Sequence, residues 1–148
     1  MTLGQKEALE CQWRVNSEPS QLSRVRRVVS MLLRLWGLGA MSGDVCIVAT
    51  ELLSNVDKHA GGGWADFSLC YQSPDVLWLM VSDASPAMPI IRETDASKTS
   101  GRGMKMVAEL TESWHALPTR TGKIVACRFA VPPAPLPAPC EALKRRAS

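Results

Sequence analysis

The sequence predicts an α+β domain, a two-layer sandwich with helices on one face of a mainly antiparallel mixed sheet. Two segments in the first sixty residues carry apolar side chains at helical spacing. Strand-like segments in the second half follow one another in pairs joined by short turns, which is typical of antiparallel hairpins. The resulting order, β-α-α-β-β-lid-α-β-β, places the helices together against one sheet.

Length and composition fit a single domain. A chain of 148 residues with 46% hydrophobic content can bury one core. No apolar run approaches the roughly 20 residues of a membrane span, and the N-terminus lacks a signal-peptide pattern, so we expect a cytoplasmic protein without membrane contact. The five cysteines contain no CxxC pair and indicate neither a disulfide framework nor a zinc site. Cys46, Cys70 and Cys127 lie among apolar residues, and we expect them to be buried small hydrophobes.

Three regions are expected along the chain. Residues 1–10 form an N-terminal extension, residues 11–131 the folded domain, and residues 132–148 a Pro-rich, basic tail that we expect to be extended or disordered. The net charge is only +3, and the folded part has no basic face with interleaved aromatic residues. We therefore expect no direct contact with nucleic acid.

The first elements are a short strand and a helix. Residues 11–15 alternate weakly and predict a strand. Residues 17–20 carry a helix-start signal, and Gly37 and Gly39 end the helix. Its apolar stripe follows spacings of three and four residues: Leu22, Val25, Val29, Leu32 and Trp36.

A second helix, from Ser42 to His59, carries the first candidate site residues. Glu51 and Asn55 are four residues apart, so they lie on one helix face, one turn from each other. That face lies beside the apolar stripe, at the rim of the core. A carboxylate there can polarise a water or a hydroxyl, and an amide oxygen can help to hold a hard cation such as Mg²⁺. The stripe consists of Val45, Val48, Leu52 and Val56.

The second half of the chain predicts two hairpins and a short helix. Residues 84–100 have neither helical nor strand periodicity, and a long irregular segment in a compact domain is often a functional lid. The strands are expected at Trp64–Tyr71, Val76–Ser82, Ser113–Leu117 and Lys123–Val131, and the helix at 104–110.

Two further motifs can contact a ligand. Asp83 ends an apolar strand, where its carboxylate can accept a hydrogen bond from an amino group such as the exocyclic amine of adenine. Gly101, Arg102 and Gly103 stand at a helix start, where glycines allow close approach and free N–H groups favour phosphate. Each motif alone is more often an ordinary turn.

The order and spacing of these motifs resemble the GHKL (Bergerat-fold) ATP-binding superfamily over roughly residues 10–131. Within it they look like the small anti-sigma regulatory factor and serine/threonine kinase branch of actinobacterial type. Residues 51–60 (ELLSNVDKHA) are similar to its N box, residues 81–86 (VSDASP) to its first glycine box, and residues 101–107 (GRGMKMV) to its second.

The resemblance implies a role for each matching residue. Glu51 would be the catalytic carboxylate that orients or deprotonates the attacking hydroxyl. Asn55 would be the Mg²⁺ ligand that bridges the metal to the ATP phosphates, and Asp83 would read adenine. The phosphates would lie beneath the lid formed by residues 84–100, held by Gly101, Arg102 and Gly103.

The chain departs from the family pattern in two places. Ser85 and Ala87 replace the two glycines of the first glycine box. Ile124 stands where many relatives carry a threonine that helps to bind adenine, and one lost contact weakens binding by about 1 kcal/mol. His59 matches a position that the family often fills with His, and we expect it to end the helix in a structural role.

Three functions follow from the resemblance. The first is an ATP-dependent protein serine/threonine kinase that binds a sigma factor and phosphorylates an anti-anti-sigma (STAS-type) partner. The second, motivated by the departures, is a non-catalytic module in which bound ATP sets partner affinity. The third is an interaction protein with a relict pocket. A homodimer is possible for each.

Overall fold

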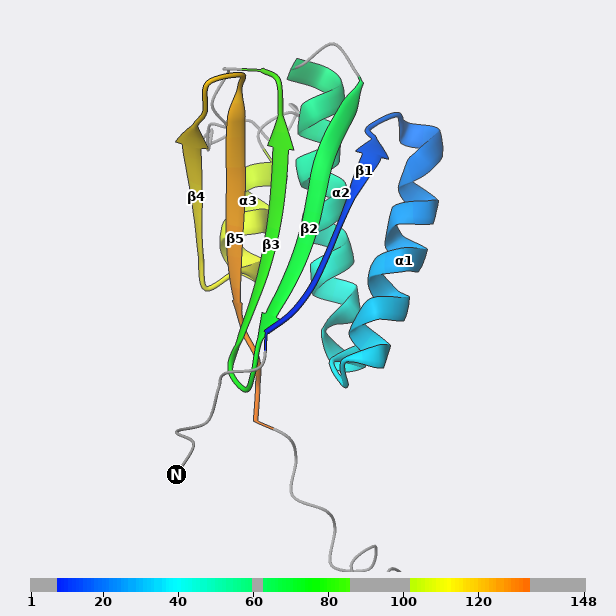
Figure 1. Cartoon of the computed structure of the whole chain (residues 1–148), viewed down its shortest axis with the longest axis vertical. Coiled ribbons are helices and arrows are strands. Elements are labelled where there is room, and N and C mark those ends of the chain that lie inside the picture. Colours follow the sequence, from blue (N-terminus) through cyan, green and yellow to red (C-terminus); the bar gives the residue numbers. More distant parts are fainter. Residues whose placement is uncertain (1–7, 60–62, 86–101, 134–148) are drawn as a thin grey trace, which may run out of the picture.

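The computed structural model describes residues 8–59, 63–85 and 102–133, and every structural statement below concerns these ranges. They form two layers, a five-stranded sheet and three α-helices that all cover the same face of it (Figure 1). The elements are β1 (Ala8–Asn16), α1 (Leu22–Leu35), α2 (Ser42–His59), β2 (Trp64–Gln72), β3 (Val76–Asp83), α3 (Arg102–Leu110), β4 (Ser113–Pro118) and β5 (Lys123–Ala130). Single 3₁₀ turns, Pro19–Gln21 and Gly39–Met41, precede α1 and α2.

The sheet has the strand order β1-β2-β3-β5-β4, and each of these pairings is antiparallel. The predicted fold class is therefore confirmed, but the mixed character expected for the sheet is wrong for the strands described. The reason lies in the last hairpin. β4 and β5 pair with each other, and the hairpin joins the sheet through β5, so that β5 runs antiparallel to β3 as well.

The predicted strands and helices are all present, with changes in some of their bounds and in which side chains are buried. β1 begins at Ala8 instead of residue 11, because β2 is long enough to pair with it as far as Gln72. Near the end of α1, Leu33 is fully buried, whereas Leu32 and the C-cap residue Trp36 are only half-buried. Val25, Val29 and Leu33 follow at spacings of four and form the line that faces the core.

Helix α2 is the most buried helix because it lies between α1 and α3 and also packs on the sheet. Its buried side chains extend well beyond one narrow stripe, since neighbours cover it on two sides. Glu51 and Asn55 are half-buried, at the edge of this surface. The buried residues are Val45, Cys46, Val48, Ala49, Leu52, Leu53 and Val56.

The cysteines differ from one another in environment. Cys46 and Cys127 are buried, as predicted, and desolvation raises the pKa of the Cys127 thiol to about 12. It therefore remains a protonated, apolar side chain at neutral pH. Cys70 is only half-buried, and the prediction of burial is wrong for it, because it alternates with the core residue Leu69 and points to the other face of the sheet.

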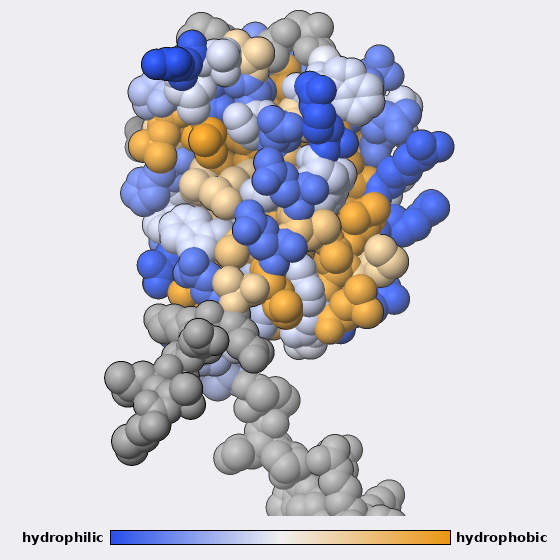
Figure 2. Space-filling model, viewed as in Figure 1, coloured by the Kyte–Doolittle hydropathy of each residue, from blue (hydrophilic) through white to orange (hydrophobic). Residues whose placement is uncertain are grey.

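The face of the sheet without helices is mixed in character, as Figure 2 shows for the same view. Trp78 on β3 is half-buried, and the guanidinium of Arg128 on β5 lies 5.9 Å from the centre of its ring. Such a face suits an antiparallel sheet with one side towards solvent. None of the helices described is long and apolar enough to cross a membrane.

The start of β5 packs against the end of β3 through a glycine. A Cβ atom at Gly122 would collide with the carbonyl oxygen of Asp83 and would lie 2.7 Å from both the C and the Cα atoms of Ala84. These are backbone atoms, which cannot rotate away. The missing side chain therefore allows the two strand ends to close on each other.

We expect Gly122→Ala to lower the free energy of unfolding by about 2 kcal/mol or more, because the two strands must separate to admit the methyl group. Urea denaturation followed by tryptophan fluorescence measures this change. The matched control is Gly43→Ala in α2, where a Cβ atom meets nothing within 4 Å. The control should be neutral or more stable by up to about 1 kcal/mol. Equal effects of the two substitutions would contradict the close packing at Gly122.

Candidate functional site

The candidate residues form two groups near the end of the sandwich where α2 and β3 end and where α3 and β5 begin, towards the top of Figure 1. Glu51 and Asn55 come from α2, Gly103 from α3 and Asp83 from β3. Three expected parts of the site lie outside the described residues: Gly101, the side chain of Arg102, and the expected lid beyond Ser85, which includes Ala87.

Glu51 lies against the first turn of α3. A Cβ atom at Gly103 would collide with Oε2 of Glu51 and would lie 3.4 Å from its Cδ. The carboxylate therefore occupies the space that a side chain at position 103 would fill. Within the described ranges this half-buried carboxylate has no hydrogen bond or ion pair. The positive end of the α3 dipole favours a negative charge at this place.

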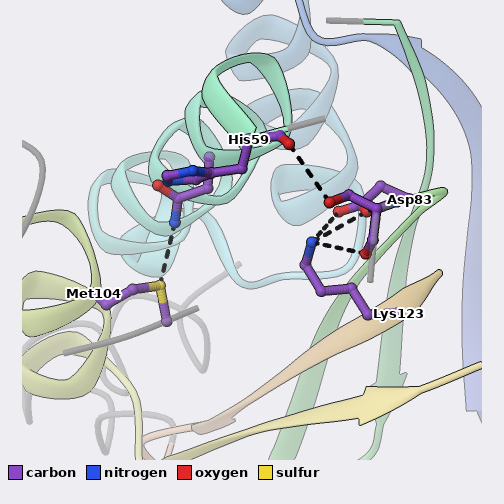
Figure 3. Close-up of polar contacts among 6 residues, drawn as sticks. His59, Asp83, Met104 and Lys123 are labelled. Carbon is purple, nitrogen blue, oxygen red and sulfur yellow. Dashed lines mark hydrogen bonds and ion pairs between the residues drawn. The ribbon is translucent and has the colours of Figure 1, made fainter. Parts of the chain in front are cut away.

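Asn55 contacts α3 one helical turn further along α2. Its Nδ2 donates a hydrogen bond to Sδ of Met104 over 3.3 Å, and Met104 is itself buried (Figure 3). This bond turns the amide so that Oδ1 faces away from the sulfur. Oδ1 accepts no hydrogen bond from the residues described, so it is available as an oxygen ligand. The free Oδ1 of Asn55 therefore suits a hard cation such as Mg²⁺, and Glu51 lies one helical turn away on the same helix.

Unlike the oxygens of Glu51 and Asn55, the carboxylate of Asp83 has a partner among the residues described, because it forms a buried ion pair with Lys123. The two residues face each other across β3 and β5, and Nζ of Lys123 lies 3.1 Å from Oδ1 and 3.0 Å from Oδ2 of Asp83 (Figure 3). The side chain of Asp83 is 2% exposed and that of Lys123 is 6% exposed. Both charges are therefore removed from water and depend on each other.

Ser85 connects this ion pair to α2. Its backbone N–H donates to Oδ1 of Asp83 over 2.7 Å, and its carbonyl oxygen accepts from Lys123 Nζ over 3.2 Å. Its hydroxyl donates to the carbonyl oxygen of His59 over 3.5 Å. His59 is exposed and is the last residue of α2, which agrees with the structural role expected for it.

Lys123 is the site residue that the sequence analysis missed. A signal for it existed, because Lys123 has the same strand parity as Val125, Cys127 and Phe129, which are buried. Ile124 has the opposite parity, is half-buried and pairs with Ser82. The side chain of Ile124 therefore lies on the other face of β5 from that of Lys123, and the residue paired with Asp83 is Lys123.

Removing one partner of a buried ion pair leaves an unpaired charge, which costs about 3–5 kcal/mol. We therefore expect Lys123→Met to lower the free energy of unfolding by about 3 kcal/mol, and the double variant Lys123→Met/Asp83→Asn to recover most of that loss. Urea denaturation of the four proteins of this cycle measures the effect.

The control for this cycle is Lys58→Met, which removes an exposed ammonium group from α2. It should change the stability by less than about 0.5 kcal/mol. If Lys123→Met is as stable as the control, the Asp83–Lys123 ion pair does not contribute to the free energy of unfolding, and the prediction is wrong.

Comparison with known families agrees with this architecture. Residues 15–129 match the family described as "Histidine kinase-like ATPase domain", a range that runs from the end of β1 almost to the end of β5 and contains every candidate residue named above. No curated protein matches the chain. The antiparallel sheet with three helices on one face is consistent with the Bergerat fold. The chain belongs to the histidine kinase-like ATPase family of the GHKL superfamily, whose domains bind ATP.

Proposed function

We propose that this protein is an ATP-dependent serine/threonine kinase of the anti-sigma type, which binds a sigma factor and phosphorylates an anti-anti-sigma (STAS-type) partner. The observation that carries the proposal is the state of Glu51. Its half-buried carboxylate has no partner in the described part of the chain, and it lies one helical turn from Asn55 and against the start of α3. The order of the three sequence motifs supports the anti-sigma branch.

Bound Mg-ATP would supply the phosphoryl group that is transferred. Oδ1 of Asn55 would hold the metal, because its amide nitrogen is already engaged by Met104. The N–H groups of the first turn of α3, together with Gly101 and Arg102, would hold the phosphates. These groups position the nucleotide and balance the charge of the transferred phosphoryl group, which is the main task of a protein in phosphoryl transfer.

Glu51 would act on the partner's hydroxyl. Its carboxylate would accept the proton of the attacking serine or threonine as that oxygen bonds to the γ-phosphorus, while the bond from the γ-phosphorus to the bridging oxygen breaks and ADP leaves. A carboxylate bound to a lysine or arginine would be less available for this task, so the missing counter-ion matters. Asp83, which is ion-paired, would serve at the base end of the nucleotide.

Two substitutions in α2 separate chemistry from binding. We expect Glu51→Gln to reduce phosphoryl transfer at least about 100-fold with Mg-ATP affinity unchanged within about threefold. Asn55→Ala should weaken Mg-ATP binding about tenfold or more, because it removes the metal ligand. Transfer of ³²P from ATP to the STAS-type partner and isothermal titration calorimetry are the two measurements.

Glu109→Gln is the control, since Glu109 is an exposed carboxylate on α3. Transfer by Glu51→Gln at the control's rate would refute the catalytic role of Glu51. Absence of binding at millimolar Mg-ATP in the unmodified protein would refute the kinase altogether.

The space at Gly103 allows a second test of Glu51. In Gly103→Ala the methyl group takes the place of the Glu51 carboxylate, which can move because it ends a flexible side chain. We expect transfer to fall about tenfold or more through misplacement of this group. The free energy of unfolding should change by less than about 1 kcal/mol. Gly43→Ala is again the control, and full activity of Gly103→Ala would contradict the proposed position of Glu51.

A second candidate function is a non-catalytic switch, in which bound nucleotide sets partner affinity. The Asp83–Lys123 pair favours it, because the expected base-reading carboxylate already has a partner. Mg-ATP binding that changes the affinity for the partner without any label transfer would identify this function.

A further inference from the structure

We infer that Lys123 sets the base selectivity of the nucleotide site, so that the site accepts 6-oxo as well as 6-amino purine nucleoside triphosphates. The inference rests on the proposed function, in which Asp83 is the carboxylate at the base. It adds a residue that none of the three sequence motifs contains, and it names the substrate class that follows from the charge of that residue.

The hydrogen bonds of Asp83 leave little of its carboxylate free. A carboxylate offers about four lone-pair positions. Oδ1 accepts from the Ser85 N–H over 2.7 Å and from Lys123 Nζ over 3.1 Å. Oδ2 accepts from the same ammonium group over 3.0 Å. One position on Oδ2 therefore remains for a ligand.

The donors of Lys123 are also engaged, but not equally. Its ammonium group has three N–H donors, and three acceptors surround it within 3.2 Å: both Asp83 oxygens and the carbonyl oxygen of Ser85. The contact with Ser85 is the longest of the three and involves a neutral acceptor, so it is the weakest. One donor can turn from Ser85 to a ligand while the ion pair stays intact.

The pair thus offers a ligand one acceptor and one donor side by side. A 6-amino purine can donate to the remaining position on Oδ2. A 6-oxo purine can accept from the ammonium group, which also neutralises the carboxylate that would otherwise repel its oxygen. A carboxylate alone would offer only the first of these contacts, and a site built for one hydrogen-bonding pattern rejects the other strongly.

The same pair explains how Asp83 remains buried when no base is bound. A carboxylate with 2% exposure needs a partner at all times. An apolar side chain at position 123, like those at the buried positions that follow in β5, would leave it unpaired. Lys123 therefore provides the positive charge that Asp83 needs when no adenine amine is bound. As a consequence, the site discriminates less between a 6-amino and a 6-oxo purine.

The test compares Mg-ATP with Mg-ITP, which carries an oxo group where ATP carries the 6-amino group. Calorimetry on the full chain should give a ratio Kd(ITP)/Kd(ATP) below about fivefold. In Lys123→Met this ratio should rise about tenfold or more, because ITP then faces an unpaired carboxylate. Any loss of folded protein affects both nucleotides alike and leaves the ratio unchanged. The control is Lys58→Met, for which we expect the same ratio Kd(ITP)/Kd(ATP) as for the unmodified protein.

The outcomes separate this inference from the proposed function. A ratio above about fivefold in the unmodified protein, or a rise of less than about tenfold in Lys123→Met, overturns the role of Lys123. Tight ATP binding in the same experiment still supports the nucleotide site. If neither nucleotide binds to the unmodified protein, the proposed function fails and the inference fails with it. If Lys123→Met does not fold, the ratio of the unmodified protein decides alone.

Discussion

The burial of α2 on two sides is the constraint on which the rest of the molecule depends. Seven of its side chains are buried among α1, α3 and the sheet, so the helix can neither rotate nor slide without opening the core. Its rim residues therefore have fixed directions. Glu51 and Asn55 point towards α3 because the neighbouring positions belong to the core. The side chains of Glu51 and Asn55 therefore have defined positions, because they border the most buried helix of the fold.

The two candidate carboxylates have contrasting environments, and this contrast supports the roles proposed for them. Asp83 is buried, paired with Lys123 and hydrogen-bonded to the backbone of Ser85, so its charge is already balanced. Glu51 is half-buried, and none of the residues described pairs with it. A balanced charge suits recognition, whereas an unbalanced one suits proton transfer. In the proposed function, the same functional group would thus serve two purposes because its surroundings differ.

The sequence was sufficient to predict what depends on local periodicity. The bounds of α2 and the alternation in β5 follow from the spacing of apolar residues, and the convergence of Glu51 with Gly103 follows from the motif order. The features that were not predicted from the sequence depend on pairing between strands that are distant along the chain. The contact of Lys123 with Asp83 needs the register of β3 on β5, across 40 residues of chain. The fully antiparallel sheet likewise depends on which strand of the last hairpin joins β3.

The closure at Gly122 has a consequence for how the molecule responds to a ligand. The chain leaves β3 after Asp83, forms α3 and the edge strand β4, and comes back beside β3 at Lys123, so the ion pair and the glycine contact join the two ends of this long segment. Bringing the two ends of such a segment together costs conformational entropy, and these contacts offset that cost. In the proposed site, a base that takes a Lys123 donor away from the Ser85 carbonyl oxygen weakens one of these contacts while the ion pair stays intact. By thermodynamic reciprocity, a change that strengthens the Lys123–Ser85 contact would weaken base binding, and base binding would weaken that contact by the same free energy.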